Sequence, residues 1–126
     1  MALVKRVLCP QRLRQVPPQF SWIDHRLVRD RHIAGRSANA LALYLFLVTV
    51  ADGQGLSYYS DAAMGRLLPL DAAGLAGARQ ELVRARLIAY QKPLYQVLSL
   101  DPPACVPRSG AAQSLGQILR QMEPQP

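Results

Sequence analysis

The chain has 126 residues, half of them hydrophobic, and a formal net charge of +7 at pH 7. Its length suits one domain, and its apolar content excludes a chain that is disordered throughout. No apolar run reaches the roughly 20 residues of a membrane-spanning helix, and the two cysteines form no CxxC pair or disulfide framework. We expect a soluble, cytoplasmic, unprocessed protein without metal or cofactor, because its Cys and His residues also lack zinc-site spacing.

The positive charge lies mainly in the N-terminal part of the chain. Residues 1–36 hold eight Lys or Arg against two Asp, a net charge of +6, whereas residues 37–100 hold five basic against four acidic residues, or +1. Residues 1–19 alternate basic and apolar side chains and end in two prolines, which block a continuous helix. This pattern predicts a flexible basic arm. Such an arm indicates a polyanionic partner, and the alternative is a leader that only keeps the protein soluble.

Residues 20–36 mix apolar and charged side chains without the clear periodicity of a strand or a helix. We predict a strap with one or two helical turns that packs on the domain. Its apolar anchors are Phe20, Trp22, Ile23, Leu27, Val28 and Ile33.

The first strong helix is predicted from Ser37 to Ala51. Ser37 is a favourable N-cap residue, and Gly53 is expected to end the helix as its C′ residue. Residues 40–50 are apolar on every side, so the strap can cover only one face of this helix. We therefore expect a homodimer through the helix near residues 40–50.

Two further helices are predicted in close succession after a short extended segment. In chain order these elements are Leu56–Tyr59, Ser60–Leu68 and Asp71–Ala85. Ser60 and Asp71 are favourable N-caps, and Pro69 separates the two helices. The inner face of the last helix consists of Leu75, Ala78, Leu82 and Ala85, at helical spacing.

A compact hairpin follows, with strands Leu87–Tyr90 and Leu94–Leu100 joined by residues 91–93. The extended segment before the second helix can add a third strand at its edge. Residues 101–126 begin as a proline-rich linker and then repeat Leu115, Ile118, Leu119 and Met122 at helical spacing. Three alternatives stay open for this short C-terminal helix: docking on its own domain, contact with a second copy, and disorder.

This order of elements predicts an α+β fold, the winged helix-turn-helix, with a three-helix core and a small antiparallel β-wing. The predicted organisation is a basic arm (1–19), a winged helix-turn-helix domain (20–100) and a linker and tail (101–126). The layout is mostly used to place one helix in the major groove of DNA.

From Trp22 to Leu100 the chain resembles bacterial winged-helix proteins of the replication-initiator and mobile-element type. The stretches that carry the resemblance are Arg31–Ile33, Ala40–Leu47, Gly55–Ser60 and Glu81–Ile88. The last stretch resembles the family's junction between recognition helix and wing, with Arg86 where the family usually has glycine. The resemblance implies a DNA-binding module in transcription regulation, replication initiation or mobile-element maintenance.

Few residues of the predicted recognition helix can read bases. Its outward face carries Ala73, Ala76 and Gly77, and its hydrogen-bond donors are Gln80 and Arg84, with Arg79 on the flank. The residues expected to contact DNA are Arg79, Gln80, Arg84, Lys92, Ser60, Arg66, Arg12 and Arg14.

We therefore expect a non-enzymatic protein that binds double-stranded DNA. The sequence contains no nucleophile elbow, phosphate-binding loop or paired-carboxylate motif, and no small-molecule ligand is evident. The alternative is a protein-interaction module that kept the winged-helix scaffold and lost base readout. The small side chains on the outward helix face favour the alternative, whereas the basic arm favours DNA.

Overall fold

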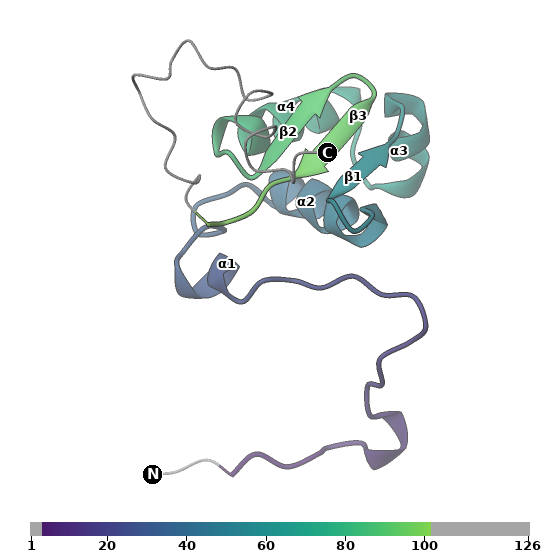
Figure 1. The fold of residues 1–126 in the computed structure, drawn as a ribbon, viewed down its shortest axis with the longest axis vertical. Helices are drawn as coiled ribbons and strands as arrows, with labels where there is room; N and C mark the ends of the chain where they lie inside the picture. The colour runs from purple at the N-terminus through teal and green to yellow at the C-terminus, as the bar shows by residue number, and fades with distance from the viewer. Residues whose placement is uncertain (1–3, 102–126) are drawn as a thin grey trace, which may run out of the picture.

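The computed structural model describes residues 4–101 and shows an α+β protein with a small three-stranded antiparallel sheet (Figure 1). Its helices are α1 (Arg26–Arg29), α2 (Ala38–Val50), α3 (Asp61–Leu67) and α4 (Ala72–Arg84). Its strands are β1 (Leu56–Tyr58), β2 (Ile88–Gln91) and β3 (Leu94–Val97), and a single 3-10 turn, η1, covers Pro10–Arg12. The helix predicted near residues 115–122 lies outside the described residues. No helix within residues 4–101 is both long and apolar enough to cross a membrane.

The three long helices begin where the sequence predicts. The side chains of Ser37, Ser60 and Asp71 each accept a hydrogen bond from the backbone N–H three residues later. Each bond satisfies an amide that the helix itself leaves unpaired, and such a cap stabilises a helix by about 1 kcal/mol. The predicted starts of α2, α3 and α4 are therefore confirmed.

The predicted end of α2 is wrong in one respect, because Gly53 is not a left-handed C′ residue. The chain becomes extended already at Ala51, and Asp52 then accepts hydrogen bonds from the backbone N–H groups of Gln54 and Leu56 at 2.8 and 2.9 Å. The left-handed conformation falls two residues later, at Gly55, where φ is +85°. The turn held by the Asp52 side chain thus sets the path of the chain after α2, which Gly53 was expected to set.

The sheet confirms the predicted third strand at the edge of the hairpin. Its order is β1-β3-β2, and both pairings are antiparallel. Tyr95 of β3 stands opposite Ser57 of β1 on one side and Tyr90 of β2 on the other. Strand β3 is shorter than the predicted Leu94–Leu100 and ends at Val97, although Leu98 N–H still donates a hydrogen bond to the carbonyl of Leu87 at 3.0 Å.

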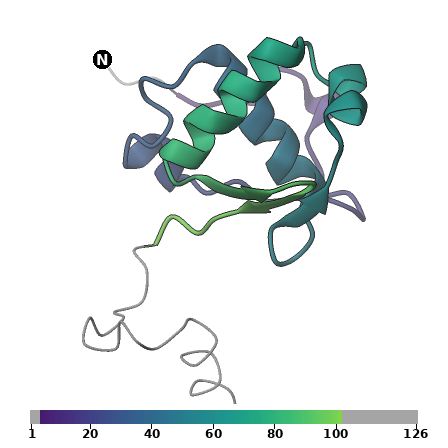
Figure 2. The ribbon, with the colours of Figure 1, turned by 90° about the horizontal axis from the view of Figure 1, so that it is seen from above.

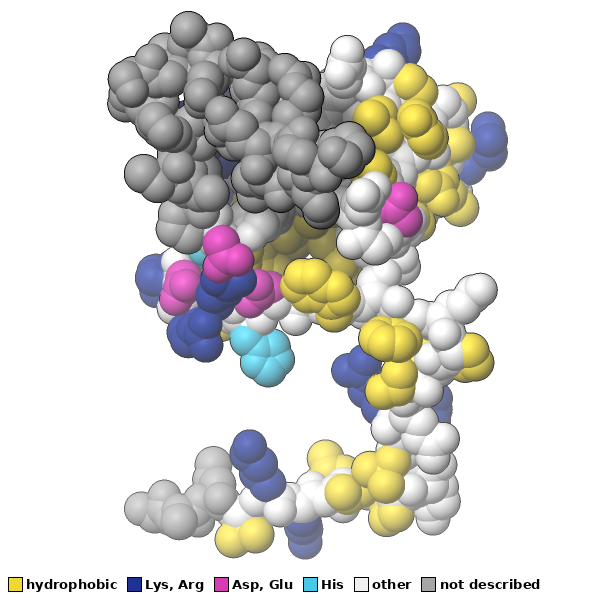
Figure 3. All heavy atoms as spheres, in the orientation of Figure 1, with side chains coloured by type: hydrophobic (Ala, Val, Ile, Leu, Met, Phe, Trp, Pro, Cys, Tyr) yellow, Lys and Arg dark blue, Asp and Glu magenta, His cyan; other side chains and the backbone are white. Residues whose placement is uncertain are grey.

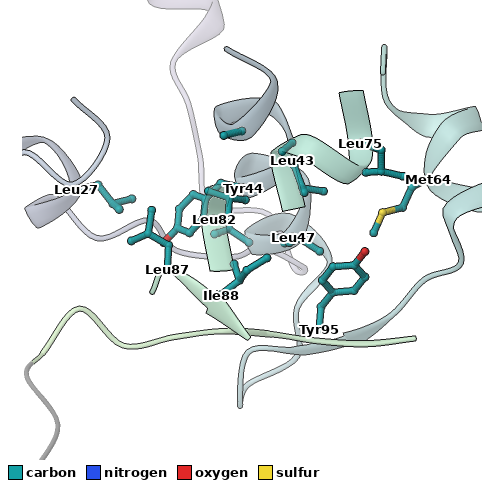
Figure 4. Close-up of a cluster of buried hydrophobic side chains, with 13 residues drawn as sticks. Leu27, Leu43, Tyr44, Leu47, Met64, Leu75, Leu82, Leu87, Ile88 and Tyr95 are labelled. Atoms are coloured by element: carbon teal, nitrogen blue, oxygen red, sulfur yellow. The ribbon is translucent and has the colours of Figure 1, made fainter. Parts of the chain in front are cut away.

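The hydrophobic core lies between the sheet and the helices α2 and α4, which cover one face of it (Figure 2). Tyr95 points from the sheet toward Met64 of α3, and both side chains are fully buried (Figure 4). The predicted inner face of α4 supplies three of the buried residues, Leu75, Ala78 and Leu82. The complete buried set is Leu27, Ala40, Leu43, Tyr44, Leu47, Val48, Met64, Leu75, Ala78, Leu82, Leu87, Ile88 and Tyr95.

The strap is packed less closely than predicted. Leu27, in the one helical turn α1, is buried and Ile33 is partly buried, but Phe20, Trp22, Ile23 and Val28 are more than half exposed. Phe20, Trp22 and Ile23 are exposed because residues 20–24 run as extended chain along the domain rather than as a helix with an inner face (Figure 1). Val28 is exposed because the single turn of α1 buries only Leu27. The predicted set of six packed anchors is therefore wrong for these four residues.

Candidate nucleic-acid interface

Arg79 of α4 forms the centre of a polar cluster that joins α3, α4 and the hairpin. Its Nη1 donates hydrogen bonds to Asp61 Oδ1 at 2.9 Å and to Tyr95 Oη at 2.8 Å. Its guanidinium also lies over the ring of Tyr90, with Cζ 4.6 Å from the ring centroid. Only 15% of the side chain is exposed. Arg79 therefore fixes how the hairpin sits against the two helices, instead of projecting from the flank of α4.

The charge state of this cluster is well defined. Partial burial opposes the charged guanidinium, but the hydrogen bonds to Asp61 and Tyr95 outweigh it and raise the pKa of Arg79 above its ordinary value. Burial raises the pKa of the Tyr95 hydroxyl, which consequently stays neutral at physiological pH. Arg79 is thus a permanently charged guanidinium held by one carboxylate and two aromatic side chains.

The outward face of α4 carries the pattern expected from the sequence. Ala73, Ala76 and Gly77 are exposed, and a Cβ added at Gly77 would meet nothing within 4 Å. Gln80 and Arg84 follow on the same helix and are exposed, with no hydrogen-bond partner for either side chain among residues 4–101. The outward face of α4 therefore carries only small residues along its first two turns. Near its end it carries two side chains, Gln80 and Arg84, that can donate hydrogen bonds to a partner.

The connection from α4 to β2 adds a cation that the sequence interpretation did not place in the site. Arg86 has φ +62°, its N–H bonds the carbonyl of Val83 at 3.0 Å, and Leu87 N–H bonds the carbonyl of Leu82 at 3.1 Å. This is the left-handed helix end that glycine usually provides. The arginine keeps that geometry, and it leaves an exposed cation two residues from Arg84. The two arginines at this junction, Arg84 and Arg86, were the sequence signal that could have placed Arg86 in the candidate site.

The other domain residues that were expected to contact DNA lie on α3 and the hairpin, around α4. Arg66 is exposed in the last turn of α3, and Lys92 is exposed in the turn between β2 and β3. That turn lies beside the start of α3, because Tyr59 N–H bonds the carbonyl of Pro93 at 3.2 Å. Ser60 uses its hydroxyl oxygen to cap α3, which leaves the hydroxyl proton free to donate.

Arg12 and Arg14 lie in the arm, where every residue from Val4 to Phe20 is exposed. Within residues 4–101 no hydrogen bond or ion pair joins these two side chains to the domain, so the structure does not bring them together with α4. The basic side chains of the arm stand apart from the domain in Figure 3. The first polar contact of this segment with the domain is made by Ser21, whose Oγ donates to the carbonyl of Thr49 at 3.1 Å.

The acidic side chains of the described residues all have internal partners, whereas several basic side chains have none. Every carboxylate among residues 4–101 has an internal partner: Asp52 and Asp71 bind backbone amides, and the others bind Arg side chains or Ser37. By contrast Arg66, Arg84, Arg86 and Lys92 form no ion pair within the described part of the chain. The near-neutral domain therefore presents four cations without an ion pair, whereas each of its carboxylates has a hydrogen-bond or ion-pair partner.

Glu81 gives the clearest example. Its carboxylate accepts hydrogen bonds from Ser37 Oγ at 2.6 Å and from Ser37 N–H at 2.8 Å, and so ties the middle of α4 to the start of α2. These bonds, with a smaller contribution from Arg36, lower the pKa of the Glu81 carboxyl below its ordinary value. The carboxylate of this α4 residue is therefore engaged by a partner within the fold.

Comparisons with known proteins add no further likeness: no protein-family model, curated protein or solved structure matches this chain.

Proposed function

We propose that this protein binds double-stranded DNA through a winged helix-turn-helix. The observation that carries the proposal is the charge asymmetry of the α3, α4 and hairpin unit, where each carboxylate has an internal partner whereas Arg66, Arg84, Arg86 and Lys92 have no ion pair within residues 4–101. Such a surface attracts a polyanion. Each DNA phosphate that an unpaired Lys or Arg neutralises releases counterions, and this release increases the affinity. The order of helices and strands and the sheet order β1-β3-β2 are compatible with the winged layout.

In this proposal α4 enters the major groove. Gln80 and Arg84 face base edges, and the exposed Ala and Gly residues let the helix approach closely. Lys92 at the hairpin turn, Arg66 on α3 and the Ser60 hydroxyl contact phosphates on either side. Arg79 does not touch DNA and instead holds the hairpin and α3 in position. With so few base-reading donors, phosphate contacts supply most of the affinity and sequence choice is modest.

The arm adds the remaining affinity. Arg12 and Arg14 follow the backbone or enter a minor groove, as basic arms of other DNA-binding domains do. The biological role we propose is transcription regulation, or replication or maintenance of a mobile element, without catalysis.

We also propose a homodimer on the open side of α2. Most of this helix is covered by α4, the sheet and Leu27, but Leu45 is 56% exposed. It borders a shallow apolar depression that is shared with Ile23, Ile33 and Leu41. A second copy would cover this surface and would place two DNA-binding units side by side.

One observation favours a second candidate function, a protein-interaction module. The exposed residues in the first two turns of α4 are small, namely Ala72, Ala73, Ala76 and Gly77, which suits close contact with another protein as well as it suits a groove. A protein-interaction module needs no unpaired cations on this surface. It therefore predicts no salt-dependent binding to DNA through them.

The deciding experiment measures binding of the full chain to a labelled random DNA duplex at several salt concentrations. For the Lys92→Ala variant we expect weaker binding and a log–log salt slope that is flatter by about 0.9, the value for one phosphate contact. Arg29→Ala is the matched control, because it removes the same charge from an exposed side chain of α1 outside the proposed interface. Equal slopes for both variants, or no binding at low salt, would favour the protein-interaction module.

A further inference from the structure

A groove of about 470 Å³ lies between the strap, the C-terminal half of α2 and the chain that follows β3. Its floor contains Tyr44 and Val48 of α2 together with Val97 and Leu100. Phe20 and Trp22 of the strap line its edge, yet they are 64% and 76% exposed. Hydrophobic side chains gather in the recess between strap and domain in Figure 3. Two large aromatic side chains thus remain exposed beside a groove whose lining combines these hydrophobic residues with polar ones such as Asp52 and Gln54.

The described chain ends at the rim of this same groove. Asp101 lines it and is held there by the guanidinium of Arg26, which also binds Asp24 at 2.7 Å. The backbone N–H of Asp101 donates to Ser99 Oγ at 3.0 Å as well. These contacts fix the point from which residues 102–126 continue.

The sequence beyond that point contains a segment that suits the groove. Leu115, Ile118, Leu119 and Met122 share one face at helical spacing, whereas Gln117, Arg120 and Gln121 fall on the opposite face. Residues 102–114 connect Asp101 to this segment and can extend over roughly 40 Å, since a residue spans up to about 3.3–3.6 Å. The segment can therefore reach every part of the groove.

We propose that residues 115–122 dock in this groove of their own chain as a short amphipathic helix, with the four apolar side chains covering Phe20 and Trp22. Short helices bind weakly as free peptides, but a short connection within one chain raises the local concentration into the millimolar range. This favours the chain's own tail over an unlinked partner. The proposal does not depend on DNA binding.

Trp22 is the only tryptophan of the chain and therefore reports directly on the groove. The experiment measures its emission maximum and its quenching by acrylamide in the full-length protein. We expect a blue-shifted emission and a quenching constant several-fold below that of an exposed tryptophan. In the double variant Leu115→Asp with Leu119→Asp, emission should shift to the red and quenching should rise to the exposed level. Equal quenching of Trp22 in both proteins would overturn the proposal.

The matched control is Gln117→Asp with Gln121→Asp, which adds the same charge to the opposite face and should leave Trp22 protected. Loss of protection in this control would mean that charge, not the apolar face, decides the result, and would overturn the proposal. Dilution distinguishes the two sources of the segment: protection that disappears with dilution, together with dimers in sedimentation, would show a tail donated by a second copy and would overturn docking within one chain. A cooperative thermal transition should accompany each variant and shows that the domain remains folded, and the Leu115→Asp with Leu119→Asp variant should lose the stability that docking adds.

Discussion

Gly55 is the position at which a single methyl group should do most damage to the wing. Its φ is +85°, and a Cβ added there would lie 2.6 Å from the carbonyl oxygen of Val97. The two backbone segments at Gly55 and Val97 cannot move apart freely, because Val97 N–H donates a hydrogen bond to the Gly55 carbonyl at 2.8 Å. A left-handed L-residue costs roughly 1–2 kcal/mol, and a weakened hydrogen bond about 1 kcal/mol more. We expect Gly55→Ala to lower the free energy of unfolding by about 2–3 kcal/mol, or the melting temperature by roughly 10–20 °C.

Two other glycines provide controls for the two parts of this estimate. Gly35 also has positive φ, +80°, but an added Cβ would meet nothing within 4 Å. Gly35→Ala should therefore cost only about 1 kcal/mol, since restriction of the unfolded chain offsets part of the strain. Gly53 has neither positive φ nor a neighbour within 4 Å, so Gly53→Ala should change stability by no more than about 0.5 kcal/mol.

The assay is urea unfolding of the four proteins, followed by circular dichroism in one buffer. The difference between Gly55→Ala and Gly35→Ala isolates the close approach to Val97 from backbone strain. Equal losses of stability in these two variants would refute the argument that the approach of Gly55 to β3 restricts this turn. A large loss for Gly53→Ala would refute the account of how α2 ends.

Four further predictions concern the proposed interface and the charged groups. Changing Gln80 and Arg84 together to alanine should weaken binding to a preferred site by about 1–3 kcal/mol more than binding to random DNA, as measured by competition at fixed salt. Deleting residues 1–19 should leave the domain folded and flatten the log–log salt slope by about 0.9 for each phosphate that the arm neutralises. Leu45→Glu should convert a dimer to monomers in sedimentation at micromolar concentration, because it places a charge on the proposed apolar surface. The hydrogen bonds from Arg26 lower the pKa of Asp24 from 3.8 to about 2, so its contribution to stability is complete above pH 3.8 and is lost as the pH falls toward 2. Asp24→Asn should reduce the change in urea midpoint over that interval.

Each of these predictions has a result that would count against it. Equal loss of affinity on both DNAs would limit Gln80 and Arg84 to backbone contacts, and no loss would remove α4 from the interface. An unchanged slope after deletion of residues 1–19 would show that the arm is not a phosphate clamp. A wild-type protein that sediments only as monomer would remove the dimer. An identical acid dependence for Asp24→Asn would mean that the carboxylate is equally free in the folded and unfolded chains.

The sequence by itself determined the elements that depend on local chemistry. Ser37, Ser60 and Asp71 start their helices because a side-chain oxygen can reach an amide three residues on, whatever surrounds the helix. The same holds for the hairpin, whose turn and flanking apolar residues lie within one short stretch. The apolar spacing on α4 likewise identified its buried face, because that spacing repeats with the helix. Arg66, Arg84, Arg86 and Lys92 could be named from the sequence, but the absence of an ion pair at each of them within residues 4–101 could not.

The tertiary structure decided the partners of residues that are distant in the chain. Arg79 was expected on a solvent-facing flank, but Asp61 and Tyr95, 18 and 16 residues away, bring it into a polar cluster. Glu81 is turned inward by Ser37, 44 residues earlier. Phe20 and Trp22 remain exposed because the strap is extended, a property that its mixed pattern did not specify. Such outcomes depend on which surfaces meet when the helices pack on the sheet, and the energy of those contacts is absent from any local window of the sequence.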